Sequence, residues 1–106
     1  MSIELTPIAD ALVSATKAAL RVTAAAYDAE IRDLVSAALD DLKIAGVAAD
    51  ALAAETPDPL IKRAVVTYCK AHFGYDNPDA ERFALAYHSL RIHLSLSSEY
   101  RQEESA

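Results

Sequence analysis

Apolar residues recur every three or four positions in four segments of this chain, the spacing that places them on one face of an α-helix. The first segment covers about residues 7–20, with Thr6 as the expected N-cap and Pro7 at the first helical position. The second begins within residues 23–28 and ends just before Gly46, a helix-stopping residue. These two segments predict two helices in the first half of the chain.

The second half of the chain also predicts two helices, and the residues that mark the helix ends are clearer there. Residues 47–57 are Ala-rich and predict a loop that contains a helical turn at most. Asp58 is a suitable N-cap and Pro59 a suitable first residue for a third helix, which we expect to continue to about Phe73 and to end at Gly74. One face of this helix is predicted from its spacing: Ile61, Ala64, Val65, Tyr68 and His72.

The last and longest helix is expected to start with Asn77 as cap and Pro78 just inside, and to reach Ser97 or beyond. Its apolar residues form two roughly opposite stripes. The first stripe contains Phe83, Tyr87, Leu90 and Leu94, and the second contains Leu85, Ile92 and Leu96. One stripe suffices to dock a helix on its own bundle, so the second is either buried inside the monomer or covered by another subunit.

The chain has 106 residues, of which 53% are hydrophobic, and only two glycines and four prolines. This composition excludes disorder and favours long helices over a β-sandwich or barrel. We therefore predict an all-α fold, a small bundle of four to five helices with a long C-terminal helix. Residues 1–101 are expected to form a single domain and residues 102–106 a flexible polar tail.

Charge is the next constraint, with ten Lys and Arg against 16 Asp and Glu, a net charge of -6. No basic patch is evident, which argues against a nucleic-acid binder. The acidic residues are concentrated in the first half of the chain. Asp33, Asp40 and Asp41 lie off the apolar face of the second helix and are candidates for a solvent face, or for a surface that repels DNA phosphates.

Residues able to carry chemistry are few and poorly spaced. Cys69 stands alone among apolar neighbours, and we expect a buried small side chain. Cys69 and His72 are three apart, but such a pair falls short of a zinc site and lacks the third group of a catalytic triad. His88 and His93 do not share a helical face. We predict no enzyme activity, no metal and no cofactor, and the alternative of a Cys69 or carboxylate enzyme would require a polar pocket.

Membrane association is also not expected. Glu4 and Asp10 interrupt the apolar residues near the start, which argues against a signal peptide. No apolar run reaches the ~18 residues of a membrane helix.

Several short motifs occur in an order and spacing that resemble one known family. They are residues 20–23 (LRVT), 28–31 (DAEI), 58–64 (DPLIKRA), 68–74 (YCKAHFG), 87–90 (YHSL) and 94–101 (LSLSSEYR). In these motifs the chain resembles the head–tail connector (adaptor) proteins of long-tailed phages and prophages, often labelled head-completion or DNA-packaging proteins. Residues 47–57 carry no signature of that family.

The resemblance implies a structural virion protein that assembles as a ring of about twelve copies beneath the portal. Such a ring extends the DNA channel and links the capsid to a stopper or tail-completion protein. The implied partners are other copies of the chain, the portal protein and the next neck protein, while DNA passes through without specific binding. The implied location is the virion neck, and the host cytoplasm during assembly.

Site roles follow from this resemblance only coarsely. Leu85, Ile92 and Leu96 are candidates for packing between subunits, and Tyr100 and Arg101 are candidates for docking on the portal or on a neighbouring copy. The alternative is a helical protein–protein interaction module unrelated to phage assembly.

Overall fold

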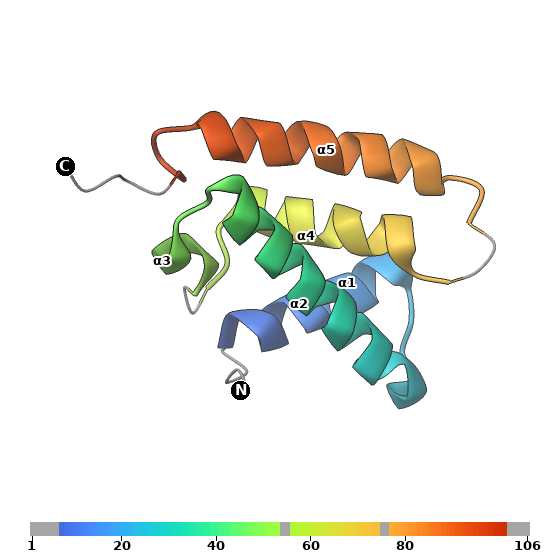
Figure 1. Ribbon diagram of the computed structural model, residues 1–106. Coiled ribbons are helices and arrows are strands. Elements are labelled where there is room, and N and C mark those ends of the chain that lie inside the picture. The colour runs from blue at the N-terminus through green and yellow to red at the C-terminus, as the bar shows by residue number, and fades with distance from the viewer. Residues whose placement is uncertain (1–6, 54–55, 75–76, 102–106) are drawn as a thin grey trace.

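The computed structural model describes residues 7–53, 56–74 and 77–101, which form five α-helices and a short 3-10 helix (Figure 1). In chain order these are α1 (Pro7–Leu20), the 3-10 helix η1 (Ala25–Tyr27), α2 (Asp28–Ala45), α3 (Ala49–Leu52), α4 (Pro59–His72) and α5 (Ala80–Leu96). The described residues contain no strand beyond one isolated bridge. The predicted all-α bundle with a long C-terminal helix is confirmed, but the last helix is not the longest as expected, because α2 has 18 residues and α5 has 17.

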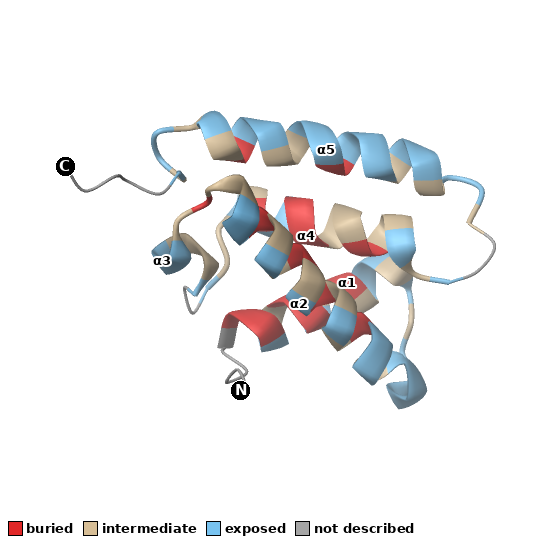
Figure 2. Cartoon of the chain, viewed as in Figure 1, coloured by how far each residue is buried: buried red, intermediate tan, exposed pale blue. Residues whose placement is uncertain are grey.

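Helix α4 is the centre of the bundle. It packs against α1 and α2 on one side and against α5 on the other, so α4 lies between α5 and α1 (Figure 1). The buried side chains line these contacts (Figure 2). They are Ile8, Leu12, Val13, Ile31, Val35, Ala38, Leu42, Val47, Ile61, Ala64, Val65, Cys69, Tyr87 and Leu94. Most of these residues come from α1, α2 and α4, and α5 adds only two of them.

The helix ends follow the local signals in two places. The carboxylate of Asp58 accepts a hydrogen bond from the backbone N–H of Leu60 at 2.9 Å, and Pro59 opens α4. Gly46 ends α2 with φ of 108°, a left-handed conformation that favours glycine. The expected cap of α1, Thr6, lies outside the described residues.

The start of α5 differs from the sequence prediction. The helix begins at Ala80, because Pro78 and Asp79 form a turn first. The Asn77 side chain accepts a hydrogen bond from the Asp79 backbone N–H at 3.2 Å and donates one to the Lys70 carbonyl at 2.6 Å. Asn77 therefore fixes the α4–α5 turn and does not cap the helix itself.

Residues 47–57, expected to be a loop with at most a helical turn, contain the four-residue helix α3. Before it, Val47 is fully buried and forms the isolated bridge with Arg101. The end of the described chain therefore returns to the end of α2. The expected polar tail, residues 102–106, lies outside the described residues.

Candidate assembly interface

Much of α5 is exposed along its outer face (Figure 2), and three of the exposed residues there are large and aliphatic. Leu85 is 65% exposed, Ile92 43% and Leu96 70%. On the opposite side of the helix, Tyr87 and Leu94 are buried. The interpretation that α5 is buried on both sides within the monomer is therefore wrong, because its own chain covers only one stripe. Three large aliphatic side chains along one helix face form the pattern by which amphipathic helices dock on a partner.

A polar contact fixes the rotation of α5 about its axis. The Asp41 carboxylate of α2 accepts hydrogen bonds from the Tyr87 hydroxyl and from Nε of Arg91, the latter at 2.9 Å. Asp41 was expected on a solvent face or on a surface that repels DNA phosphates, and that prediction is wrong, since its carboxylate is bonded to α5. The two bonds hold the stripe of Leu85, Ile92 and Leu96 toward the outside.

The Tyr87 ring is enclosed as well as hydrogen-bonded. It packs edge-on against the ring of Tyr68, with 5.1 Å between centroids and 75° between ring planes. Burial, and then the hydrogen bond donated to Asp41, raises the pKa of the Tyr87 phenol well above its usual range. The Tyr87 phenol therefore remains a neutral hydrogen-bond donor at any physiological pH.

The segment after α5 is attached to the body of the protein at two points. The Tyr100 hydroxyl donates to the Asp58 carboxylate at 2.7 Å, and the Tyr100 carbonyl accepts from the Ala48 backbone N–H at 2.7 Å. The hydrogen bond to Asp58, followed by partial burial, raises the pKa of Tyr100 to about 12. Tyr100 thus has a role within its own chain, and the adjacent Arg101 is exposed.

The residues considered for chemistry are scattered. Cys69 is fully buried, and burial raises the pKa of its thiol to about 11. His72, expected on the core face of α4, is exposed and lies against the Tyr68 ring with 4.4 Å between centroids. His88 and His93 are exposed on α5. In the described parts of the chain, no three His, Cys, Asp or Glu residues come together as they would around a metal ion.

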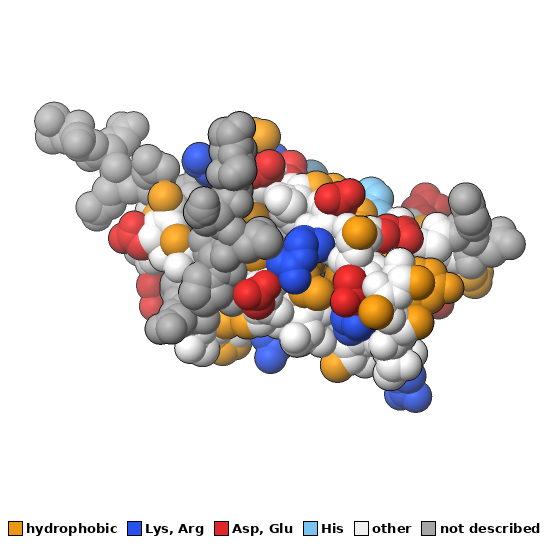
Figure 3. Space-filling model, turned by 90° about the horizontal axis from the view of Figure 1, so that it is seen from below, with side chains coloured by type: hydrophobic (Ala, Val, Ile, Leu, Met, Phe, Trp, Pro, Cys, Tyr) orange, Lys and Arg blue, Asp and Glu red, His pale blue; other side chains and the backbone are white. Residues whose placement is uncertain are grey.

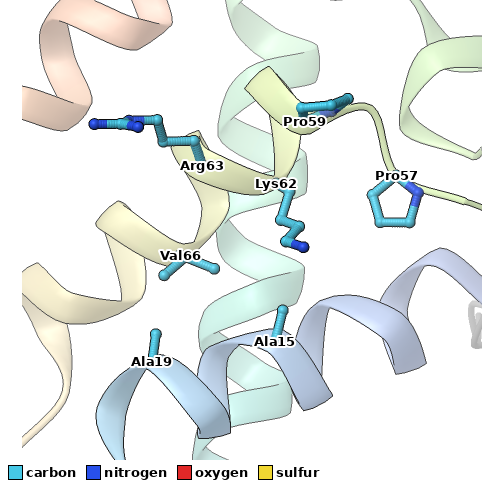
Figure 4. Close-up of a pocket in the computed structure, with 7 residues that line it drawn as sticks. All are labelled: Ala15, Ala19, Pro57, Pro59, Lys62, Arg63 and Val66. Atoms are coloured by element: carbon cyan, nitrogen blue, oxygen red, sulfur yellow. The ribbon is translucent and has the colours of Figure 1, made fainter.

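A groove between α1 and α4 was not predicted from the sequence (Figure 4). It has a volume of about 300 Å³, and the lining residues are Ala15, Ala19, Pro57, Pro59, Val66, Lys62 and Arg63. Five of the seven are apolar, and two are cationic. Ala15 and Ala19 are one helical turn apart, and this pair of small residues is the one feature of the sequence that could have indicated a groove on this helix. The other side of the groove, however, is formed by residues 57–66, which lie 38 or more positions further along the chain.

The acidic side chains do not form one continuous field. Asp33 and Asp40 are exposed on α2, as expected for a solvent face. Asp10 pairs with Arg32 at 3.0 Å, and Lys17 pairs with Asp28. On the face shown in Figure 3, acidic and basic side chains alternate, and the described residues form no continuous basic patch there. No described helix is long and apolar enough to span a membrane.

Comparison with known proteins gives a match to a family model. No curated protein matches the chain, and no solved structure matches it. A family model described as phage connector protein matches residues 12–101, a range that includes α2, α3, α4, α5 and the segment up to Arg101. This match covers far more than half of the chain. The protein belongs to the phage connector protein family.

Proposed function

We propose that this protein is a structural connector that assembles as a ring of about twelve copies in the virion neck, beneath the portal. The ring extends the DNA channel and offers a platform to a stopper or tail-completion protein. The observation that carries the proposal is the exposed stripe of Leu85, Ile92 and Leu96 on a chain of the phage connector family.

The physical argument concerns surface that the monomer leaves uncovered. A neighbouring subunit that covered these aliphatic side chains would remove apolar area from water, and the free energy of the assembly would fall by about 25 cal/mol for each Å² covered. The bonds from Tyr87 and Arg91 to Asp41 fix this stripe in a single orientation before assembly. A preoriented surface loses less conformational entropy when it binds.

Portal docking is assigned to the end of the described chain. Arg101 is exposed next to Tyr100, whose hydroxyl and carbonyl are both bonded to the body of the protein. A guanidinium held on a fixed segment is suited to bind carboxylates of a partner in two-pronged geometry. In this proposal Arg101 contacts the portal or the adjacent copy, and Tyr100 positions it.

The test is the mass of the protein, alone and mixed with the portal of the same phage, measured by light scattering and native electron microscopy. We expect rings in at least the second sample. The variant Ile92→Ser/Leu96→Ser should lose the rings and keep its helical circular dichroism. Ile44→Ser is the matched control, because Ile44 is a 79% exposed isoleucine on α2, outside the stripe.

Two results would count against the proposal. Wild-type protein that stays monomeric with the portal present would reject ring assembly. Loss of helicity in Ile92→Ser/Leu96→Ser, with Ile44→Ser unaffected, would instead assign the stripe to the stability of the monomer.

A further inference from the structure

The stripe on α5 and the groove between α1 and α4 cannot meet within one molecule. Helix α4 separates α5 from α1 (Figure 1). The stripe lies on the side of α5 opposite its buried residues, and the groove lies between α1 and α4. A closed ring needs two different surfaces on each subunit, one complementary to the other. One protruding apolar stripe and one apolar groove on separate sides of the same chain satisfy this requirement.

We propose that the α1–α4 groove of one copy receives the α5 stripe of the next copy, an inference that rests on the ring assembly proposed above. The groove is apolar along Ala15, Ala19 and Val66, and small side chains on α1 allow close approach of another helix. Leu85, Ile92 and Leu96 supply the aliphatic side chains that fill it.

Charged residues at the groove and on α5 indicate which way α5 lies in the groove. Lys62 extends over the gap between α4 and α1, whereas the Arg63 side chain leaves α4 on the side away from that gap (Figure 4). Neither residue forms an ion pair with another described residue. On α5, Glu81 is exposed one turn before Leu85 and lies on the same face. In the docked pair, Glu81 of one copy lies beside Lys62 of the next, at the rim of an apolar contact.

The first experiment is cross-linking between two chains that each carry one new cysteine. Leu85→Cys protein is mixed with Val66→Cys protein under assembly conditions, with the portal present, and treated with a short bifunctional thiol reagent. The native Cys69 is fully buried and does not compete. We expect covalent dimers only in the mixture, and none when Ile44→Cys replaces Leu85→Cys.

The second experiment exchanges the charges. Glu81→Lys and Lys62→Glu should each lose assembled rings, and the variant with both changes should recover them, because the pair is restored between neighbouring copies. Lys70→Glu is the control on the same helix, since Lys70 lies over the Phe83 ring and not in the groove.

The outcomes separate the two proposals. Rings that depend on Ile92 and Leu96, but give no Leu85–Val66 cross-link and no charge rescue, would overturn the groove assignment and leave the ring intact. Absence of rings in every sample would overturn both. Cross-links from Val66→Cys to the portal, in place of a second copy, would assign the groove to the portal and reject self-docking.

Discussion

At the scale of single residues, Tyr100 links the end of the described chain to the start of α4. Its hydroxyl donates to Asp58 at 2.7 Å. The variant Tyr100→Phe keeps the ring and removes the donor, so we expect the free energy of unfolding to fall by about 0.5 to 1 kcal/mol at pH 8. Urea denaturation measures this difference. Tyr27→Phe is the control, because Tyr27 is an exposed tyrosine and its hydroxyl has no hydrogen-bond partner among the described residues.

The same hydroxyl predicts a pH dependence. Bonding to Asp58 raises the pKa of Tyr100 from 10.0 in the unfolded chain to about 12 in the folded protein. A raised phenol pKa stabilises the fold below pH 10, and this contribution is lost as the pH rises through about 12. The stability gap between wild type and Tyr100→Phe should therefore shrink over this window. A gap that stays constant from pH 8 to 12 would show that the bond to Asp58 does not form in solution.

At the scale of elements, Asp58 serves two partners at the N-terminus of α4. It caps the helix through the Leu60 N–H and accepts the Tyr100 hydroxyl. We expect Asp58→Ala to cost about 1.5 to 2 kcal/mol, the sum of a cap and one hydrogen bond. Asp58→Asn keeps an acceptor oxygen and should cost less. In a double-mutant cycle with Tyr100→Phe, additive losses would mean that the two residues do not interact.

The contact between α2 and α5 predicts a larger loss. Asp41→Ala leaves the buried Tyr87 hydroxyl and the partly exposed Arg91 guanidinium without their acceptor, which costs about 1 to 3 kcal/mol. Asp40→Ala is the matched control, because Asp40 directly precedes Asp41 in the chain and its side chain is exposed. We expect thermal unfolding to show a lower midpoint for Asp41→Ala alone. Equal midpoints for the two variants would refute the anchoring role of Asp41.

Much of the helix arrangement was predictable, because the decisive signals are local. Gly46 and the Asp58–Pro59 pair determine helix ends by the conformations and donors that they themselves provide. The end of α1 had no such signal: Arg21 adopts φ of 59° there, an unusual conformation for a residue with a side chain. The turn is closed by two hydrogen bonds, from the Val22 N–H to the Lys17 carbonyl at 3.0 Å and from the Arg21 N–H to the Ala18 carbonyl at 3.2 Å.

The candidate interface was predictable only where it depends on the spacing of residues within one helix. Two opposite apolar stripes on one helix can be counted from the sequence, so Leu85, Ile92 and Leu96 could be named as candidates before their exposure was known. The difference between Asp40 and Asp41 depends on where α5 passes over α2, which helical spacing within α2 does not determine. The groove combines α1 with α4, so it exists only in the packed structure.

At the scale of the whole molecule, the two apolar surfaces lie on separate sides, and the polar surface between them is mixed in charge. Ion pairs such as Arg32–Asp10 and Arg91–Asp41 neutralise part of the basic charge inside the monomer. The remaining excess is acidic, with a net charge of -6 for the chain. In the ring proposed above, each subunit would add the same acidic excess, which disfavours binding of a polyanion to the assembly as a whole.

This charge balance makes a prediction about DNA. A protein that binds duplex DNA without sequence preference gains affinity by releasing counterions from phosphates, and that requires clustered Lys and Arg. The assembled protein should therefore show no mobility shift or anisotropy change with duplex DNA at about 0.15 M salt, an ionic strength at which exposed charges are screened beyond about 8 Å. Repeating the measurement at tenfold lower salt tests the argument further, because weak electrostatic binding strengthens steeply there. A complex that forms and weakens as salt is added would show a basic surface created by assembly, with Arg63 and Arg101 as the first residues to replace by Ala.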